Sequence, residues 1–244
     1  MARRGSILIS LAGGAAAVFG YGLSQQADAQ RPAAPAARAN PVVVELFQSQ
    51  GCSSCPPANA NINAIADRPD VLALSFAVTY WDRLGWKDTF GSPRWTARQW
   101  EYANRAGRPQ VATPQVILNG GATVVGNNRQ QLDAAIARAG APRGGPVLAA
   151  AGNSVRVGAA AVTAPATVWL VRYDPRVRQV PIRAGENGGR TLPHRGIVRE
   201  LVKLGNWSGP AAGFPLPAPA ERGLASAVIV QRGAGGPITA ALKL

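Results

Sequence analysis

The sequence predicts an α/β domain followed by an all-β, sandwich-like domain. Between residues 41 and 81 an apolar run, a helical segment and a second apolar run follow one another, as in a β–α–β unit. From residue 146 onward, short alternating apolar runs are separated by Gly, Asn and Pro turns, which is typical of an antiparallel sandwich. We therefore expect one domain over residues 41–142 and a second over residues 146–244.

The amino terminus has the pattern of a secretory signal peptide. Arg3 and Arg4 precede an apolar stretch, and an Ala-x-Ala cleavage pattern ends at Ala29. We assign residues 1–29 to the signal peptide and residues 30–40, rich in Pro and Ala, to a linker. The paired arginines leave general secretion and twin-arginine export both open. The protein is therefore expected to be exported, either periplasmic or extracellular, where disulfides form and persist.

The overall composition is that of a globular protein. Of its 244 residues, 47% are hydrophobic and 16% are charged, so the chain can bury a core. Beyond the signal peptide, no apolar run has the length of a transmembrane helix. The formal net charge of +14 comes mainly from arginines spread along the chain, whereas nucleic-acid-binding proteins concentrate basic residues in a stripe or arm. We therefore expect no nucleic-acid partner.

The first predicted elements surround the two cysteines. A β-branched strand over residues 41–47 leads into the cysteine turn. The helix that follows is expected to begin at Pro56 and Pro57, because prolines are tolerated in a first helical turn, and to end before Pro69. A second buried strand covers residues 71–81.

Three further elements complete the first domain. We expect a helix over residues 92–107, a hairpin over 113–126 and a helix over 127–142. Their boundaries are set by helix caps, a turn pair and terminal glycines: Ser92, Gly107, Asn119–Gly120, Asn128 and Gly140.

The second domain is expected to consist of short strands. A long polar segment, residues 186–198, interrupts them and is interpreted either as a functional loop or as a plain connection. The predicted strands cover residues 147–151, 154–160, 166–174, 176–182, 197–205, 226–232 and 237–244.

Cys52 and Cys55, in the stretch CSSC, are the only cysteines in the sequence. Two cysteines three positions apart in a tight turn lie within disulfide distance. As a redox pair, Cys52 is expected to be the exposed attacking thiolate, with a pKa lowered by the following helix, and Cys55 the buried resolving thiol. The alternative is a permanent disulfide that braces the turn, and so short a ring stabilises at the low end of ~2–4 kcal/mol. The β–α–β context favours the redox interpretation.

Metal binding is the second chemical interpretation of the cysteines. A closed structural zinc site needs four Cys or His ligands, which the chain does not have, since His194 is its only histidine. Copper is served by two thiolates and one imidazole, and Cys52, Cys55 and His194 are the one such set. Because His194 falls in the other predicted domain, copper is the weaker hypothesis and no metal is expected.

Aromatic residues gather after the second strand. Tyr80, Trp81 and Asp82 end a strand at the sheet edge where ligands bind in open α/β sheets, so we expect them to contact a substrate. Trp95 and Trp100 are instead expected to close the core under the following helix.

Residues 41–140 resemble thioredoxin-like proteins, because CSSC lies at a strand-to-helix turn and Thr113–Pro114 opens a later hairpin. The resemblance implies a cis-proline at Pro114, packed against the cysteine pair, and a Thr113 backbone that is presented to a substrate strand. It also implies a buried carboxylate beneath the cysteines that moves a proton, which Glu45 in VVVELF matches.

A narrower resemblance covers most of the chain. The segments VVELFQSQGCSSCPPAN, YWDRLGWKD, TARQWEYA and ENGGRTLPHRGIVREL are similar to an uncharacterised family of exported bacterial and plant proteins, known as a domain of unknown function. The function expected is thiol–disulfide exchange on envelope proteins or small thiols, which needs no cofactor. The alternative is a non-enzymatic envelope binding protein with a structural disulfide.

Overall fold

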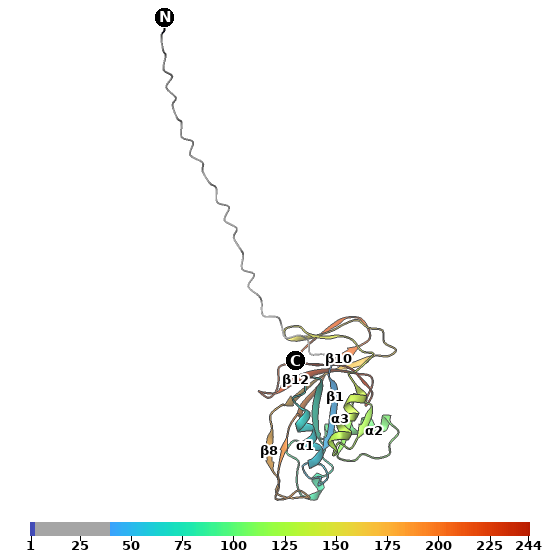
Figure 1. Ribbon diagram of the computed structural model, residues 1–244. Helices are drawn as coiled ribbons and strands as arrows, with labels where there is room; N and C mark the ends of the chain where they lie inside the picture. Colours follow the sequence, from blue (N-terminus) through green and yellow to red (C-terminus); the bar gives the residue numbers. More distant parts are fainter. Residues whose placement is uncertain (3–39) are drawn as a thin grey trace. The chain divides into compact units, whose positions relative to one another are not determined.

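A mixed eight-stranded sheet runs through both halves of the chain (Figure 1). The computed structural model describes residues 1–2 and 40–244. The predicted signal peptide (1–29) and linker (30–40) therefore lie almost entirely outside the described residues. The strand order is β13-β12-β7-β10-β2-β1-β3-β4, and two small sheets, β11-β6-β5 and β8-β9, accompany it.

The helices and strands alternate in the first half, and the second half contains strands. The helices are α1 (Pro56–Ile65), α2 (Pro93–Arg105), α3 (Arg129–Ala139) and the 3-10 turn η1 (Asp82–Leu84). The strands are β1 (Val42–Gln48), β2 (Val71–Ala77), β3 (Gln115–Leu118), β4 (Ala122–Val124), β5 (Leu148–Ala150), β6 (Ser154–Val157), β7 (Ala166–Asp174), β8 (Arg178–Pro181), β9 (Thr191–His194), β10 (Ile197–Trp207), β11 (Ala212–Pro215), β12 (Ala225–Gln231) and β13 (Ile238–Lys243).

The two halves meet between β2 and β10, which run parallel and pair at Ser75 and Ile197. The Ser75 N–H donates to the carbonyl of Gly196 at 2.7 Å. All seven residues of β2 are buried, so without this neighbour the Ser75 N–H would be a buried donor without its partner. The predicted fold class, an α/β thioredoxin-like domain followed by a separate all-β domain, is therefore wrong. Strands of both halves form one sheet, and residues 40–244 belong to one compact unit.

The two faces of the sheet are covered differently. α2 packs on one face, over a core to which both halves contribute. On the other face, α1 and α3 cover β1, β2 and β3, while the small sheet β11-β6-β5 covers β7, β12 and β13. The core under α2 includes Val43, Phe47, Leu74, Phe76, Val171, Val198, Ile229 and Ala241.

The sheet curls, so β13 at one edge approaches strands near the other. The Ile238 N–H donates to the carbonyl of Asn119 at 2.9 Å, and the Ala241 N–H donates to Asn40 Oδ1 at 2.6 Å. Gly145, at the expected domain boundary, lies in this contact. Its backbone packs so closely against β13 that a side chain would not fit, since a Cβ at position 145 would lie 2.3 Å from the carbonyl oxygen of Thr239. The segment between the halves is therefore packed against β13.

The predicted helix caps and hairpin turn of the first half are confirmed, whereas the strand predicted to reach residue 81 ends at Ala77. Ser92 caps α2 by accepting from the Arg94 N–H, and Asn128 caps α3 by accepting from the Gln131 N–H. Asn119 and Gly120 both have positive φ, 47° and 69°, as the predicted two-residue hairpin turn requires.

The second half contains two strands that were not predicted. β9 lies inside the long polar segment, and β11 pairs with β6. β9 pairs with β8 from Arg178↔His194 to Pro181↔Thr191, so the polar segment is half of a hairpin. In Figure 1 this hairpin flanks α1, with which β9 is in contact.

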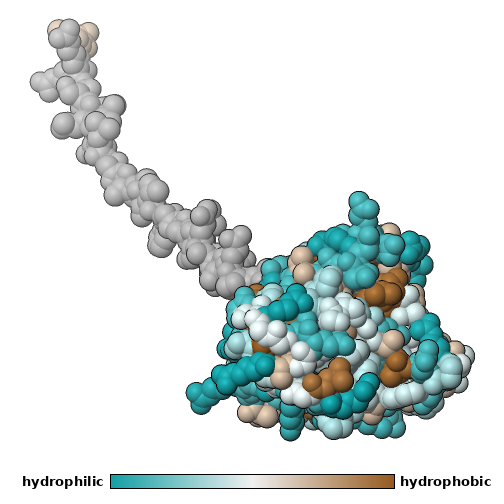
Figure 2. Space-filling view, turned by 90° about the horizontal axis from the view of Figure 1, so that it is seen from below, coloured by the Kyte–Doolittle hydropathy of each residue, from teal (hydrophilic) through white to brown (hydrophobic). Residues whose placement is uncertain are grey.

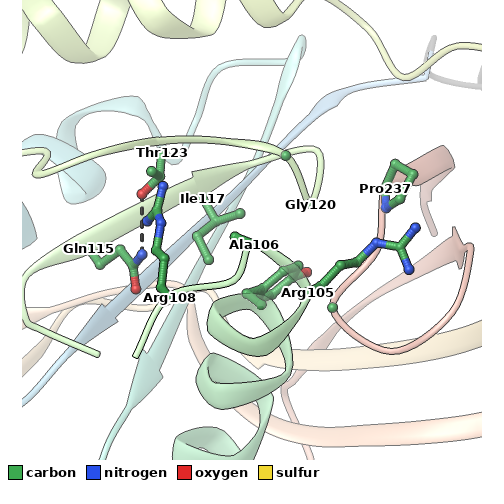
Figure 3. Close-up of a pocket in the computed structure, with 11 residues that line it drawn as sticks. Arg105, Ala106, Arg108, Gln115, Ile117, Gly120, Thr123 and Pro237 are labelled. Carbon is green, nitrogen blue, oxygen red and sulfur yellow. Dashed lines mark hydrogen bonds between the residues drawn. The ribbon is translucent and has the colours of Figure 1, made fainter. Parts of the chain in front are cut away.

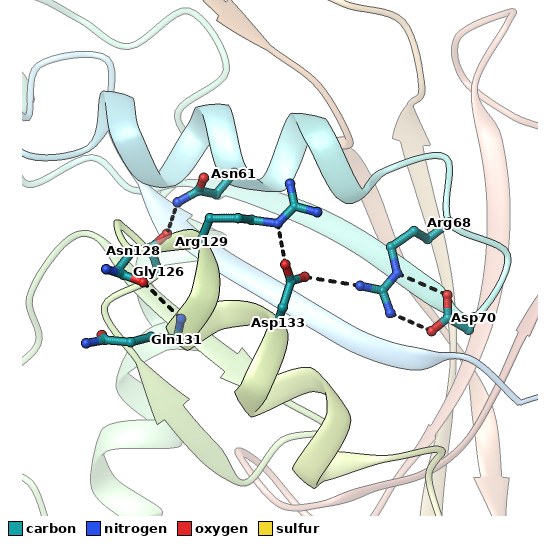
Figure 4. Close-up of polar contacts among 8 residues, drawn as sticks. All are labelled: Asn61, Arg68, Asp70, Gly126, Asn128, Arg129, Gln131 and Asp133. Carbon is teal, nitrogen blue, oxygen red and sulfur yellow. Dashed lines mark hydrogen bonds and ion pairs between the residues drawn. The ribbon is translucent and has the colours of Figure 1, made fainter.

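Exposed charges join separate elements at the surface. Asp133 in α3 pairs with Arg129 and with Arg68, which also binds Asp70 in the turn before β2 (Figure 4). Pairs of this kind each contribute about 0–1 kcal/mol. Figure 2 shows separate apolar patches in a mainly hydrophilic face. Within the described residues, no helix has the length and apolar character needed to cross a membrane.

Candidate functional site

Cys52 and Cys55 form a disulfide in the turn between β1 and α1, with their Cα atoms 5.4 Å apart. As expected, α1 begins at Pro56, and Cys55 is its N-cap residue. Both cysteines are 0% exposed, whereas the intervening Ser53 and Ser54 are exposed. The expectation of an exposed Cys52 is therefore wrong, and any reagent must first displace what covers its sulfur.

Thr113 and Trp81 lie beside the disulfide. Cys52 Sγ is 3.8 Å from the Thr113 carbonyl oxygen and 3.3 Å from Ser54 Oγ. The indole N–H of Trp81 donates to Thr113 Oγ1 at 2.7 Å. The Thr113–Pro114 peptide bond is cis, in agreement with the expected cis-proline. The structure thus brings Cys52, Cys55, Thr113 and Trp81, all predicted site residues, close together.

Besides the residues around Thr113, a second segment, residues 86–90, contacts the cysteine turn by hydrogen bonds to Gln50. The buried Gln50 side chain accepts from the Trp86 indole N–H at 2.9 Å and donates to Thr89 Oγ1 at 2.8 Å. Its backbone N–H donates to Asp88 Oδ2 at 2.7 Å. Asp88 also accepts from the Phe90 N–H at 2.9 Å. These bonds fix the turn two residues before Cys52.

Asp88 is a buried acid that contacts the cysteine turn directly, through the Gln50 N–H. Burial raises the pKa of its carboxyl to about 6, although the N–H groups of Gln50 and Phe90 favour the charged form, and the neighbouring Asp82 raises the pKa further. A carboxyl that titrates near pH 6 can exchange a proton at physiological pH. Asp88 is thus a charged group at the site that the sequence reasoning did not select.

A third segment, residues 182–190 between β8 and β9, lies over the cysteine turn. The Asn187 side-chain amide donates to the carbonyls of Gln50 and Cys52 at 2.9 and 2.8 Å. Glu186 accepts from the Ser53 N–H at 2.9 Å. Neither residue belongs to the predicted site, although both lie in the long polar segment that carries the family resemblance.

Glu45 lies elsewhere in the core, on the face of β1 that packs against α2. It is 0% exposed and pairs with Arg98 at 2.8 Å, and it also accepts from the Tyr102 hydroxyl. Burial and the negative charge of Glu45 raise the pKa of Tyr102, while Arg98 opposes this. Because its carboxylate is engaged by Arg98 and Tyr102, its role as a proton carrier for the cysteines stays a prediction.

His194, in β9, is buried and packs edge-on against Phe90, with ring centroids 6.0 Å apart. Neither ring nitrogen has a hydrogen-bond partner among the described residues, and burial lowers the pKa of His194 to about 4. The structure does not bring His194 together with Cys52 and Cys55 as a copper set. In the described part of the chain, no three His, Cys, Asp or Glu side chains are grouped to hold a metal ion.

The remaining aromatic and acidic candidates have different surroundings. Tyr80 donates to Gln99 at 3.3 Å and is partly buried against the core under α2. The Asp82 carboxylate accepts from the Asp88 N–H at 3.1 Å and so supports the second segment. Trp95 is buried as predicted, but Trp100 is 37% exposed, so its predicted place in the core is wrong.

A cavity of about 290 Å³ lies between the end of α2 and the β3–β4 hairpin (Figure 3). Arg105 reaches towards Pro237, while Arg108 lies beside Gln115 and Thr123. Neither arginine forms an ion pair with the described residues, so the rim of this cavity carries uncompensated positive charge and attracts anionic groups.

Two solved structures are similar to this chain. Protein AGR_C_4864 from Agrobacterium tumefaciens shares 32% sequence identity, with a TM-score of 0.67 over 83% of this chain and 93% of that chain. HBP35 of Porphyromonas gingivalis shares 13% identity, with a TM-score of 0.57 over 84% of this chain and 74% of that chain. At this lower identity the likeness concerns the fold alone. No curated protein matches.

One protein family matches residues 43–231, which make up most of the sequence and include both cysteines and the segment that covers them. The expected membership of an uncharacterised family is confirmed by this match. The chain belongs to the family described as protein of unknown function (DUF1223).

Proposed function

We propose that this chain is an exported thiol–disulfide oxidoreductase whose redox centre is the Cys52–Cys55 pair. The observation that supports the proposal is the position of the disulfide. It lies at the junction of a strand and a helix, with Cys52 Sγ 3.8 Å from the Thr113 carbonyl, next to exposed Ser53 and Ser54. A signal-peptide pattern supports export, and an exported protein meets thiols and disulfides of other envelope proteins.

The exchange is a sequence of two nucleophilic substitutions. A partner thiolate attacks Cys52 Sγ, the bond to Cys55 breaks, and the electron pair leaves on Cys55 Sγ, which takes up a proton. A second partner thiolate then attacks the partner sulfur in the mixed disulfide and releases Cys52 as a thiolate. The partner leaves as a disulfide and the pair has gained two electrons, while the reverse sequence oxidises a dithiol.

The second candidate is a disulfide that only braces the turn, in a protein that binds partners without redox chemistry. The complete burial of both cysteines favours it. Against it, a disulfide that spans three positions closes a very short ring and constrains little of the unfolded chain. The two candidates differ in the reduction potential that they require.

The test is the reduction potential of the pair in the purified protein. The chain is equilibrated in glutathione and dithiothreitol buffers from both the oxidised and the reduced side, and free thiols are trapped by alkylation. Exchange chemistry requires a potential within about −270 to −120 mV, whereas a value below about −300 mV identifies a structural bond and contradicts the proposal.

Single cysteine variants give the matched control. In Cys55→Ser the remaining Cys52 can form a mixed disulfide that is not resolved, so we expect a stable adduct with a small disulfide probe. Cys52→Ser leaves only the sulfur beneath the first turn of α1 and is expected to form the adduct much more slowly. Equal trapping by both variants would contradict the assignment of Cys52 as the attacked sulfur.

A further inference from the structure

The β8–β9 connection, residues 182–190, lies against the backbone of the turn that carries the disulfide. Its base is apolar, since Val180, Ile182 and Leu192 pack with Trp86 and Phe90. Its tip is polar, and Glu186 and Asn187 bind the backbone of the cysteine turn by hydrogen bonds. The base therefore anchors the hairpin by buried apolar area, while the tip is held by a few hydrogen bonds.

Asn187 attaches the tip of this connection to the cysteine turn. Its side chain is 0% exposed, and its amide nitrogen uses both hydrogens, one for the Gln50 carbonyl and one for the Cys52 carbonyl. Its Oδ1 accepts from Arg190 at 2.8 Å, which fixes the orientation of the amide. The tip approaches so closely that a Cβ at Gly185 would lie 3.9 Å from the Cα of Gly51. These contacts hold the tip against the backbone on either side of Cys52, which is 0% exposed.

Glu186 adds a negative charge at the residue between the cysteines. Its exposed carboxylate accepts from the Ser53 N–H at 2.9 Å, and this hydrogen bond lowers the pKa of Glu186, so the carboxylate is charged at neutral pH. An anion at this place opposes the formation of a thiolate on Cys52. It also occupies an N–H that would otherwise be free to bind a partner.

We propose that residues 182–190 form a gate, in which Asn187 blocks access to the disulfide and Glu186 suppresses the nucleophilicity of Cys52 until a partner displaces the tip. When the tip moves away, the sulfur of Cys52 becomes accessible, its neighbouring carboxylate departs, and the Ser53 N–H is free to donate to a backbone carbonyl of the partner. The inference rests on the proposed exchange reaction at Cys52–Cys55.

Two substitutions separate the two effects. Asn187→Ala removes the bonds to Gln50 and Cys52 but leaves the charge of Glu186. Glu186→Gln removes the charge but keeps an oxygen that can accept from the Ser53 N–H. Glu101→Gln is the matched control, because it removes one negative charge from an exposed residue of α2.

The first readout is the rate at which dithiothreitol reduces the oxidised full chain, followed by alkylation of the free thiols. We expect Asn187→Ala to accelerate reduction roughly tenfold. Without the lost hydrogen bonds, the closed position of the tip would be less stable by about 1.4 kcal/mol, and this free energy corresponds to a factor of ten in rate. Glu186→Ala, which changes only an exposed side chain, repeats the test without a buried substitution in case Asn187→Ala does not fold. If both variants are reduced at the rate of the unchanged chain and of Glu101→Gln, the gate is disproved.

The second readout is the pH dependence of Cys52 alkylation in the reduced protein. We expect Glu186→Gln to lower the pKa of the Cys52 thiol relative to both the unchanged chain and Glu101→Gln, and an unaltered profile would disprove the role of Glu186. These outcomes are distinct from failure of the proposed function. Faster reduction of Asn187→Ala combined with a potential below about −300 mV would leave the gate in place and remove the exchange reaction.

Discussion

His194 is a buried ionisable residue whose two ring nitrogens have no partner among the described residues. Burial lowers its pKa to about 4, so it is neutral in the folded protein at neutral pH. In the unfolded chain the imidazole takes up a proton near pH 6.5. Between these values the unfolded state binds more protons, and stability is therefore lost as the pH falls from about 6.5 to about 4.

The substitution His194→Leu tests this effect. We expect the variant to be more stable than the unchanged chain at pH 7, because two unpaired buried nitrogens are removed, and its advantage to grow by about 3 kcal/mol as the pH falls to 4. Urea unfolding at several pH values measures the difference. An advantage that does not change with pH would show that His194 does not titrate as inferred.

Asp88 has the opposite effect on the pH dependence. Its folded-state pKa is raised to about 6, so the folded protein binds the extra proton and stability falls as the pH rises from about 4 to about 6. In the unchanged chain the effects of His194 and Asp88 oppose each other over this range. In His194→Leu the contribution of Asp88 is expected to become visible.

Single residues were predictable where the sequence itself marks their chemistry. Cys52, Cys55 and Trp81 stand out by type and spacing, and the structure brings them together with Thr113. Gln50 and Asn187 did not stand out, because a buried amide has the same sequence signature as an exposed one. Their role depends on a contact between positions far apart in the chain, at 2.9 Å from Asn187 Nδ2 to the Gln50 carbonyl.

At the scale of the elements, a buried polar network joins β1, α2 and β12. Glu45 pairs with Arg98, which also donates to Gln231 at 3.2 Å, and Gln231 donates to the Tyr102 hydroxyl at 3.0 Å. Each member is buried, so each must be satisfied by the others. The network links the first half of the chain to the second through side chains as well as through the sheet.

Arg98→Met is expected to destabilise the protein strongly. It leaves the Glu45 carboxylate buried without its cation, which typically costs about 3–5 kcal/mol of unfolding free energy. The double variant Glu45→Gln/Arg98→Met should recover part of this loss. Arg129→Met, which breaks an exposed pair with Asp133, is the control and should cost about 0–1 kcal/mol in the same urea experiment. Equal losses for Arg98→Met and Arg129→Met would contradict the inference.

Local sequence signals predicted most of the elements. The caps at Ser92 and Asn128 and the turn at Asn119–Gly120 depend on neighbouring residues, and all three are found as expected. β9 was missed because Pro193 and the polar residues around it resemble a loop. Its strand conformation comes from pairing with β8 and from contact with α1, where Asn63 donates to the Pro193 carbonyl at 3.0 Å.

At the scale of the whole molecule, the decisive feature is that the two halves share one sheet and one core. Each half of the sequence has the pattern of a separate domain. Hydrophobic periodicity indicates which residues are buried, but it does not indicate which strands pair with each other. Every residue of β2 is buried, and this is compatible both with a separate α/β domain and with a strand in the middle of a larger sheet. The pairing of β2 with β10 was therefore beyond prediction from the patterns alone.

We expect a fragment of residues 41–142 not to fold by itself. It would lack β10, which completes the edge of β2, and the residues of β7 and β12 that fill the core under α2. Near-ultraviolet circular dichroism and thermal unfolding of the fragment, compared with the chain that includes residues 143–244, measure this. A cooperative thermal transition in the fragment would contradict the expectation.

The junction of β2 and β10 also has a consequence for synthesis. β2 ends at Ala77 and pairs on one edge with β1, which precedes it, but its partner on the other edge, β10, begins only at Ile197. Ribosomes add about 5–20 residues per second, so an apolar strand with an unpaired edge persists for on the order of ten seconds while the chain is being made. Such an edge can pair with other chains. We therefore expect the newly made protein to need protection from such pairing until β10 has emerged.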